Sequence, residues 1–169
     1  MVIQSAHVAV FTDVHIFRGI VLTGRRRVSD MLNDSMSQYI ELEDVQVYSV
    51  LRPTRSVREM ASAYVSKRNC LFVAVLREEF KDPLARFFAY VERVAWPGIL
   101  YVGAYEIHGT LFFKTKQESK GPLVRPGESF LPVAKALVYS MLNPRVQVRA
   151  PVVLVRDGTF SAFFYEEAQ

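Results

Sequence analysis

Short runs of apolar, β-branched and aromatic residues, separated by polar breaks, make up most of the chain, and such runs are typical of β-strands. In the N-terminal half they predict strands over residues 8–11 and 15–22, followed by a long strand over residues 39–50. Along the long strand the alternating apolar positions change phase between Leu42 and Val45, which indicates a bulge or a bend. We therefore expect a mostly β fold with strongly bent strands.

One heptad occurs twice in the chain. Residues 47–53, VYSVLRP, return as residues 138–144, VYSMLNP, with five of the seven positions identical. A glycine also interrupts the second predicted strand of each half, Gly19 in one and Gly109 in the other. Glycine inside a strand is typical of a bulge or a tight bend. The chain is therefore expected to contain two related β units that bend at the same place.

Residues 56–67 satisfy the rules for two different structures. Ser56 and Glu59 form the sequence signature of a capping box, and apolar residues follow at helical spacing. The corresponding residues of the second half, 146–155, are β-branched and include Pro151, which favours a strand. Because related halves share a fold, we expect a strand in both places.

A helix is expected between the two units. Asp82 can cap its first turn, and apolar residues recur at helical spacing over residues 83–95, before Trp-Pro-Gly at residues 96–98 ends the pattern. This linker helix places the boundary between a first β unit, residues 1–80, and a second, residues 81–169.

Each unit is expected to end in a turn followed by an apolar closing strand, over residues 70–76 and 159–165. Neither segment contains the Pro or Lys residues that block edge-to-edge pairing of strands. We therefore expect a homo-oligomer that forms through strand edges.

The densest positive charge lies just after the second predicted strand, at Arg25, Arg26 and Arg27. Guanidinium groups are preferred partners of phosphate. Together with the turn residues Lys67 and Arg68, these arginines are candidate contacts for the backbone of single-stranded nucleic acid.

Two further features belong to the same candidate site. Tyr39 is available for stacking on a base, and Ser29, Asp30 and Asn33 form a turn motif within the loop. The alternative is a structural loop, in which one arginine pairs with Asp30 or Asp34 and binds no ligand.

The predicted layout of five strands in meander order, with a bent second strand and a long connection before the third, resembles the Sm-like barrel of the Sm and Lsm proteins and the bacterial host-factor RNA chaperone. Sm proteins carry a glycine in the bent strand and an Asp-x-x-Met-Asn signature before the third strand. This chain has Gly19 and Asp30-Met31-Leu32-Asn33, one residue shorter inside the motif. The resemblance implies two tandem five-stranded Sm-like barrels, joined by the helix, that assemble into closed rings.

A second resemblance covers the same loop. The stretch from Arg27 to Asn33 is similar to the Arg-x-Ser-Asp-x-Leu-Asn segment of a family of small uncharacterised bacterial proteins. This resemblance implies no particular activity.

Composition and charge limit the classes of protein to which this chain can belong. Half of the 169 residues are hydrophobic and 22% are charged, which is typical of a folded globular chain. A net charge of +4 permits an anionic partner without requiring one. Cys70 is the only cysteine, so an intramolecular disulfide and a thiolate metal site are excluded.

Because no apolar run approaches about 18 residues and residues 1–6 lack the features of a signal peptide, we expect a cytoplasmic protein without a membrane partner.

The sequence contains no recognisable catalytic constellation. His7, His15 and His108 do not have metal-ligand spacing, and no glycine-rich phosphate loop or nucleophile elbow occurs. We therefore expect no enzyme, no cofactor and no metal. The best-supported function is an oligomerising scaffold or assembly module. The alternatives are a single-stranded RNA- or DNA-binding protein that uses the basic loop, and a sensor with a small ligand lodged between the barrels.

Overall fold

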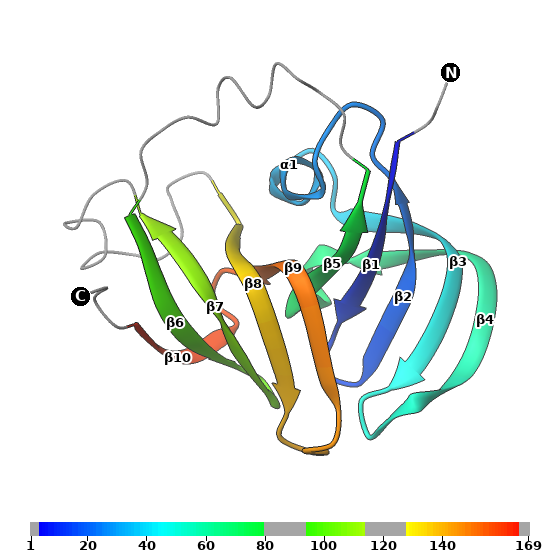
Figure 1. Cartoon of the computed structure of the whole chain (residues 1–169). Coiled ribbons are helices and arrows are strands. Elements are labelled where there is room, and N and C mark those ends of the chain that lie inside the picture. The colour runs from blue at the N-terminus through cyan, green and yellow to red at the C-terminus, as the bar shows by residue number, and fades with distance from the viewer. Residues whose placement is uncertain (1–3, 80–93, 114–127, 166–169) are drawn as a thin grey trace.

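The computed structural model describes residues 4–79, 94–113 and 128–165. Over these ranges the chain forms one antiparallel sheet of ten strands, in the order β10-β6-β7-β8-β9-β5-β1-β2-β3-β4. Figure 1 shows the two halves side by side, with β10 at one end of the sheet and β4 at the other. The mostly β prediction is confirmed. The sheet does not close, and the two expected barrels appear as one continuous, bent sheet.

The first half, residues 4–79, contains five strands and two short helical segments. In chain order these are β1 (Ser5–Phe11), β2 (His15–Leu22), α1 (Val28–Asn33), β3 (Tyr39–Ser49), β4 (Arg52–Ser66), the 3-10 turn η1 (Lys67–Asn69) and β5 (Phe72–Glu78). The second half contains β6 (Val94–Val102), β7 (Tyr105–Phe113), β8 (Phe130–Ser140), β9 (Gln147–Arg156) and β10 (Phe160–Tyr165).

The two halves have the same strand order. The first is arranged β5-β1-β2-β3-β4 and the second β10-β6-β7-β8-β9. Both copies of the repeated heptad form the turn that connects the third and fourth strands of their half. The same backbone hydrogen bond anchors this turn in each half: Val50 donates to the carbonyl of Val14 at 2.9 Å, and Met141 donates to that of Ala104 at 2.8 Å.

The predicted bend lies at the two glycines. The β2·β3 register shifts beside Gly19, and the β7·β8 register shifts beside Gly109. A Cβ on Gly19 would lie 2.8 Å from the carbonyl oxygen of Glu43, which is too close for any side chain. The facing strands bend there too, because Asp44 and Lys135 adopt positive φ angles of 48° and 50°. The bulge inferred from the change of phase after Leu42 therefore exists, and it recurs in the second half.

Two sequence predictions can be compared with the described elements. Residues 56–66 belong to β4, so the strand inferred from the repeat is right and the capping-box signature is misleading. The predicted helix over 83–95 is wrong at its end, because Val94 and Ala95 lie in β6 and the strand continues through the Trp-Pro-Gly segment. The remainder of that helix lies outside the described residues.

The closing strand predicted over 70–76 is not a free edge. Its counterpart β5 pairs with β1 on one side and with β9 of the second half on the other. The edge strands are β10, as expected, and β4. The sequence predicted an exposed β5 because nothing local to a strand specifies which distant strand will cover it.

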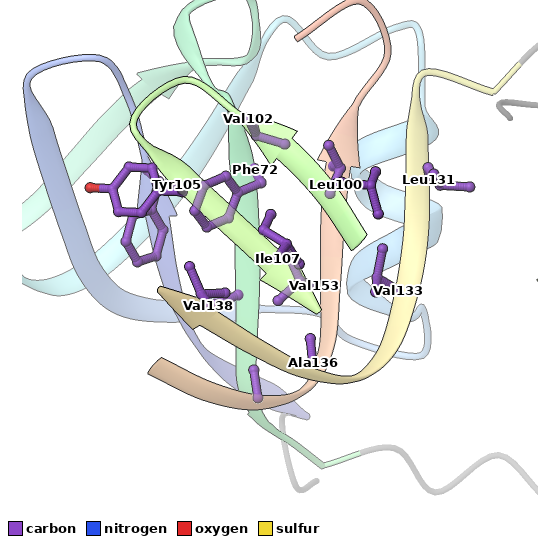
Figure 2. Close-up of a cluster of buried hydrophobic side chains, with 14 of the residues drawn as sticks. Phe72, Leu100, Val102, Tyr105, Ile107, Leu131, Val133, Ala136, Val138 and Val153 are labelled. Carbon is purple, nitrogen blue, oxygen red and sulfur yellow. The ribbon is translucent and has the colours of Figure 1, made fainter. Parts of the chain in front are cut away.

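The core connects the halves through an aromatic cluster. Phe11 of β1 stacks on Phe72 of β5 with their ring centroids 4.4 Å apart, and Tyr105 of β7 packs edge-on against both rings at 5.2 Å. Figure 2 shows Phe72 and Tyr105 beside the aliphatic side chains of the second half, with the Tyr105 hydroxyl directed away from them. Because this cluster and the β5·β9 ladder cross the boundary, we expect the two halves to unfold as one unit.

Candidate functional site

The basic loop, which carries Arg25, Arg26 and Arg27, is held in place by an ion pair next to α1. The Arg26 guanidinium donates to Asp34 Oδ2 at 3.1 Å and to the backbone carbonyl of Asp30 at 3.0 Å. The Asp30 carboxylate in turn accepts a hydrogen bond from the backbone N–H of Arg27 at 3.1 Å, at the start of the helix. One arginine therefore makes the structural pairing that the sequence analysis gave as the alternative to nucleic-acid binding.

Charged side chains from η1 and β5 satisfy the ends of α1. Lys67 Nζ donates to the carbonyls of Met31 and Asp34, both at 2.9 Å, where the helix ends. Glu78 Oε1 accepts from the N–H of Val28 at 2.7 Å, where the helix begins. Opposite charges at the two ends match the helix dipole. Burial lowers the pKa of Lys67, and the nearby Asp34 carboxylate opposes this shift.

Asn33 connects the loop motif to the second half. Its side-chain carbonyl accepts hydrogen bonds from the N–H groups of Ser129 and Phe130, at 2.8 and 2.9 Å, where β8 begins. Of the motif residues, Asp30 and Asn33 thus make defined structural contacts, whereas the Ser29 side chain makes no hydrogen bond to another described residue.

The remaining predicted residues are distributed around this helix. Arg26, Tyr39 and Lys67 line one depression of about 150 Å³ beneath α1, and Lys67 and Arg68 line an adjoining one. Arg25 is exposed and lines neither of them. Tyr39, with 57% of its surface exposed, is open to solvent. The structure therefore brings Arg26, Tyr39 and Lys67 together, but two of the three already serve the helix.

A different site lies between the halves, where one alternative of the sequence analysis put a small ligand, but the sequence did not indicate which residues form it. A cavity of about 270 Å³ is lined by residues of strands β1 to β5 from the first half and of β7, β8 and β9 from the second. Phe11, Ile16, Tyr105 and Val138 contribute to its largely apolar wall. Burial raises the pKa of the Tyr105 phenol to about 12, so this hydroxyl stays neutral at physiological pH.

Two cations border this cavity. Arg18 of β2 and Arg149 of β9 are both among its lining residues, and that lining contains no Asp or Glu. Neither arginine forms a salt bridge with any described residue. The sequence gave no signal for them, because each is an isolated arginine in an ordinary strand pattern and only the β5·β9 pairing brings the two strands near each other.

Comparison with known proteins does not identify the chain: it matches no protein-family model, no curated protein and no solved structure. Within the described ranges, no three His, Cys, Asp or Glu side chains are placed to hold a metal ion. No helix in those ranges has the length and apolar character needed to cross a membrane.

Proposed function

We propose that the protein is a non-enzymatic assembly module whose two halves are Sm-like units, and that copies join head to tail through strands β10 and β4. The Sm-like part of the proposal is supported by the shared strand order of the halves and by the glycine bend in the second strand of each. The assembly part rests on one observation, the β5·β9 ladder.

This ladder joins the last strand of one half to the fourth strand of the other. Val73 of β5 lies opposite Leu154 of β9, with four paired positions in register. Strand β10 is the equivalent of β5, and β4 is the equivalent of β9. These are the two strands that end the sheet. A second chain can therefore repeat between molecules the contact that already exists within one.

The repeat also predicts the register of the intermolecular ladder. Val73 faces Val10 in β1, and Phe163 faces Leu100 in β6, with each residue 90 positions later than its counterpart. By the same criterion, Leu154 of β9 corresponds to Tyr64 of β4. The pairing of Val73 with Leu154 thus becomes a pairing of Phe163 in one molecule with Tyr64 in the next.

Exposure at the two edges agrees with this arrangement. Phe163 and Tyr64 are both large apolar side chains, with 40% and 65% of their surfaces exposed. An uncovered edge presents unpaired N–H and C=O groups and is a template for strand addition. Because β10 and β4 are different surfaces, the contact is heterologous, and such contacts build closed rings when the rotation between subunits closes and filaments when it does not.

Disulfide cross-linking tests the register. In the double variant Phe163→Cys, Tyr64→Cys, opposed Cα atoms lie within the separation that a disulfide spans, so oxidation should link molecules into covalent dimers and higher species. Cys70 is buried and does not interfere. The matched control is Phe163→Cys, Met60→Cys, because Met60 is four residues along β4 and about 13 Å away.

The assembly itself is measured by light scattering. The wild-type protein should be larger than a monomer at micromolar concentration. Phe163→Lys and Tyr64→Lys should each weaken the assembly, and the combination Phe163→Lys, Tyr64→Glu should restore it. A monomeric wild type would contradict the proposal, and so would equal cross-linking of the two cysteine pairs.

Binding of single-stranded nucleic acid through the basic loop is the second candidate function. It is favoured by Arg25 and Arg68, which are exposed and form no salt bridge with the described residues. Replacing both by Ala should leave α1 intact and lower affinity for a fluorescent oligonucleotide in low salt, with a shallower salt dependence. If the wild type does not bind such an oligonucleotide in low salt, this candidate is wrong.

A further inference from the structure

We infer that the cavity between the halves is a binding site for a small anionic amphiphile, a molecule with an apolar body and one acidic head group. This site is distinct from the strand edges on which the assembly proposal rests. Its walls come from strands of both halves of a single chain, so it is complete in a monomer.

Size and lining specify the body of the ligand. The volume of about 270 Å³ lies just below the range of about 300–1,000 Å³ that is usual for small-molecule pockets, so a small ligand fits best. Its wall includes the edge-on pair of Phe11 and Tyr105, with aliphatic contributions from Ile16, Leu76 and Val138. An apolar chain or ring that enters the cavity would exchange water for this wall.

Charge specifies the head group. Arg18 and Arg149 approach the cavity from opposite halves, on β2 and β9. Two described arginines outside the cavity have acidic partners, Arg26 with Asp34 and Arg77 with Glu79. At the cavity no carboxylate is present among the lining residues to balance the two guanidinium groups. A carboxylate or phosphate accepts parallel hydrogen bonds from guanidinium, which is the strongest pairing available to these groups.

The internal repeat supplies a comparison. The second-half equivalent of Arg18 is His108, and the equivalent of Ile16 is Glu106, at the corresponding positions of β7. There the Glu106 carboxylate contacts the His108 ring, so this position of the second half has a side-chain partner on its own strand. The strand pattern therefore does not require a cation at position 18. Arg18 lines the cavity, whereas its equivalent His108 is not among the lining residues.

Position within the strand also directs Arg18 to the cavity. Ile16 and Arg18 are two residues apart on β2 and share one face of the sheet, and both line the cavity. Their partners across β1 are Phe11 and Ala9, which line it as well. The buried part of this face is apolar and its exposed end carries the arginine, which matches a ligand that enters with its apolar end first.

The experiment is titration of the full chain with octanoate, monitored by calorimetry and by the thermal unfolding midpoint. Octanoate should bind and should raise the midpoint, because a ligand that contacts both halves stabilises the folded chain. Octanol, of the same length but uncharged, should bind at least about tenfold more weakly. Octyl phosphate is the second anionic probe, and it distinguishes a carboxylate site from a phosphate site.

Variants locate the binding. Arg18→Gln combined with Arg149→Gln should weaken octanoate binding by at least about tenfold and should abolish its advantage over octanol. Arg77→Gln is the matched control, since Arg77 is an exposed strand arginine outside the cavity lining. Val148→Trp should block the cavity and remove binding of all three probes.

Two results would overturn the inference. One is octanoate and octyl phosphate both failing to bind the wild type at millimolar concentration. The other is octanoate binding the double arginine variant as tightly as the wild type. Circular dichroism of each variant shows whether it folds, and the arginine variants are surface substitutions that should not disturb the core.

Discussion

The side chain of Asn33, the last residue of α1, accepts a hydrogen bond from the backbone N–H of Phe130, the first residue of β8, at 2.9 Å. The end of a helix in the first half is thereby attached to the start of a strand in the second. The same oxygen also accepts from Ser129, so a single amide group satisfies two backbone donors.

Asn33→Ala should lower the free energy of unfolding by about 1–3 kcal/mol, because Phe130 N–H is left partly buried without its acceptor. Chemical denaturation monitored by circular dichroism measures the change. Ser35→Ala, on the exposed side of the same loop, is the control and should be within about 0.5 kcal/mol of the wild type. Equal stability of the two variants would show that the Asn33 contact contributes nothing.

Gly19→Ala and Gly109→Ala should each destabilise the fold by about 1–3 kcal/mol, because the added Cβ must displace backbone rather than a flexible side chain. The new methyl would lie 2.8 Å from a carbonyl oxygen in both cases, that of Glu43 or of Ala134. Thermal unfolding provides the measurement, with the exposed Ser62→Ala as control. A neutral effect at both glycines would mean that the bend does not depend on the close approach of the strands.

The Arg26–Asp34 pair should make the loop sensitive to acid. The hydrogen bond from the N–H of Met36 and that from Arg26 lower the pKa of Asp34 from its ordinary value of 3.8. The folded pKa is therefore below the unfolded one, so the stabilisation is fully present above the unfolded pKa and is lost as the pH falls through the folded pKa. The stability difference between wild type and Asp34→Asn should be constant near neutral pH and should narrow below about pH 4. A difference that does not change with pH would contradict this assignment.

Cys70 should be unreactive in the folded protein. Burial raises the pKa of its thiol to about 12, and the thiolate is the reactive form. A chromogenic disulfide reagent at pH 8 should therefore modify no thiol until denaturant is added, and then one per chain. Ser62→Cys, which adds an exposed thiol, is the positive control.

The same shift implies a loss of stability in alkali. The folded pKa of Cys70 lies above its ordinary value of 9.0, so the stabilisation is full below that pH and declines as the pH rises toward 12. Rapid modification of Cys70 in the native state at pH 8 would show that the chain opens locally between η1 and β5.

Local patterns determined the strands and their bends. The repeated heptad and the paired glycines predicted two units with the same bend, and the repeat placed 56–66 in a strand where helix rules pointed elsewhere. Strands and bends depend on residue type and on the spacing of apolar residues along the chain. A glycine, which has no Cβ, and a change in the two-residue apolar period can both be recognised in the sequence.

Apolar spacing alone predicted a helix where the second half begins, and this prediction was wrong for its last residues. Val94 and Ala95 have helical spacing with earlier residues, yet they lie in β6 opposite Phe113 and Phe112. The ladder with β7 satisfies their backbone groups and overrides the local pattern, because helix propensities differ by only a few tenths of a kcal/mol per residue.

Only the tertiary structure decided what connects the halves. The partner of β5 is β9, a strand of similar apolar character to others in the chain, and strand pairing over such a distance depends on the whole folded sheet. That pairing leaves β4 and β10 as the edges, brings Arg18 and Arg149 to one cavity, and gives Asn33 its partners in the second half. The sequence alone determined that this chain folds as two bent β units; which of their charged residues meet was decided by the way the units pack.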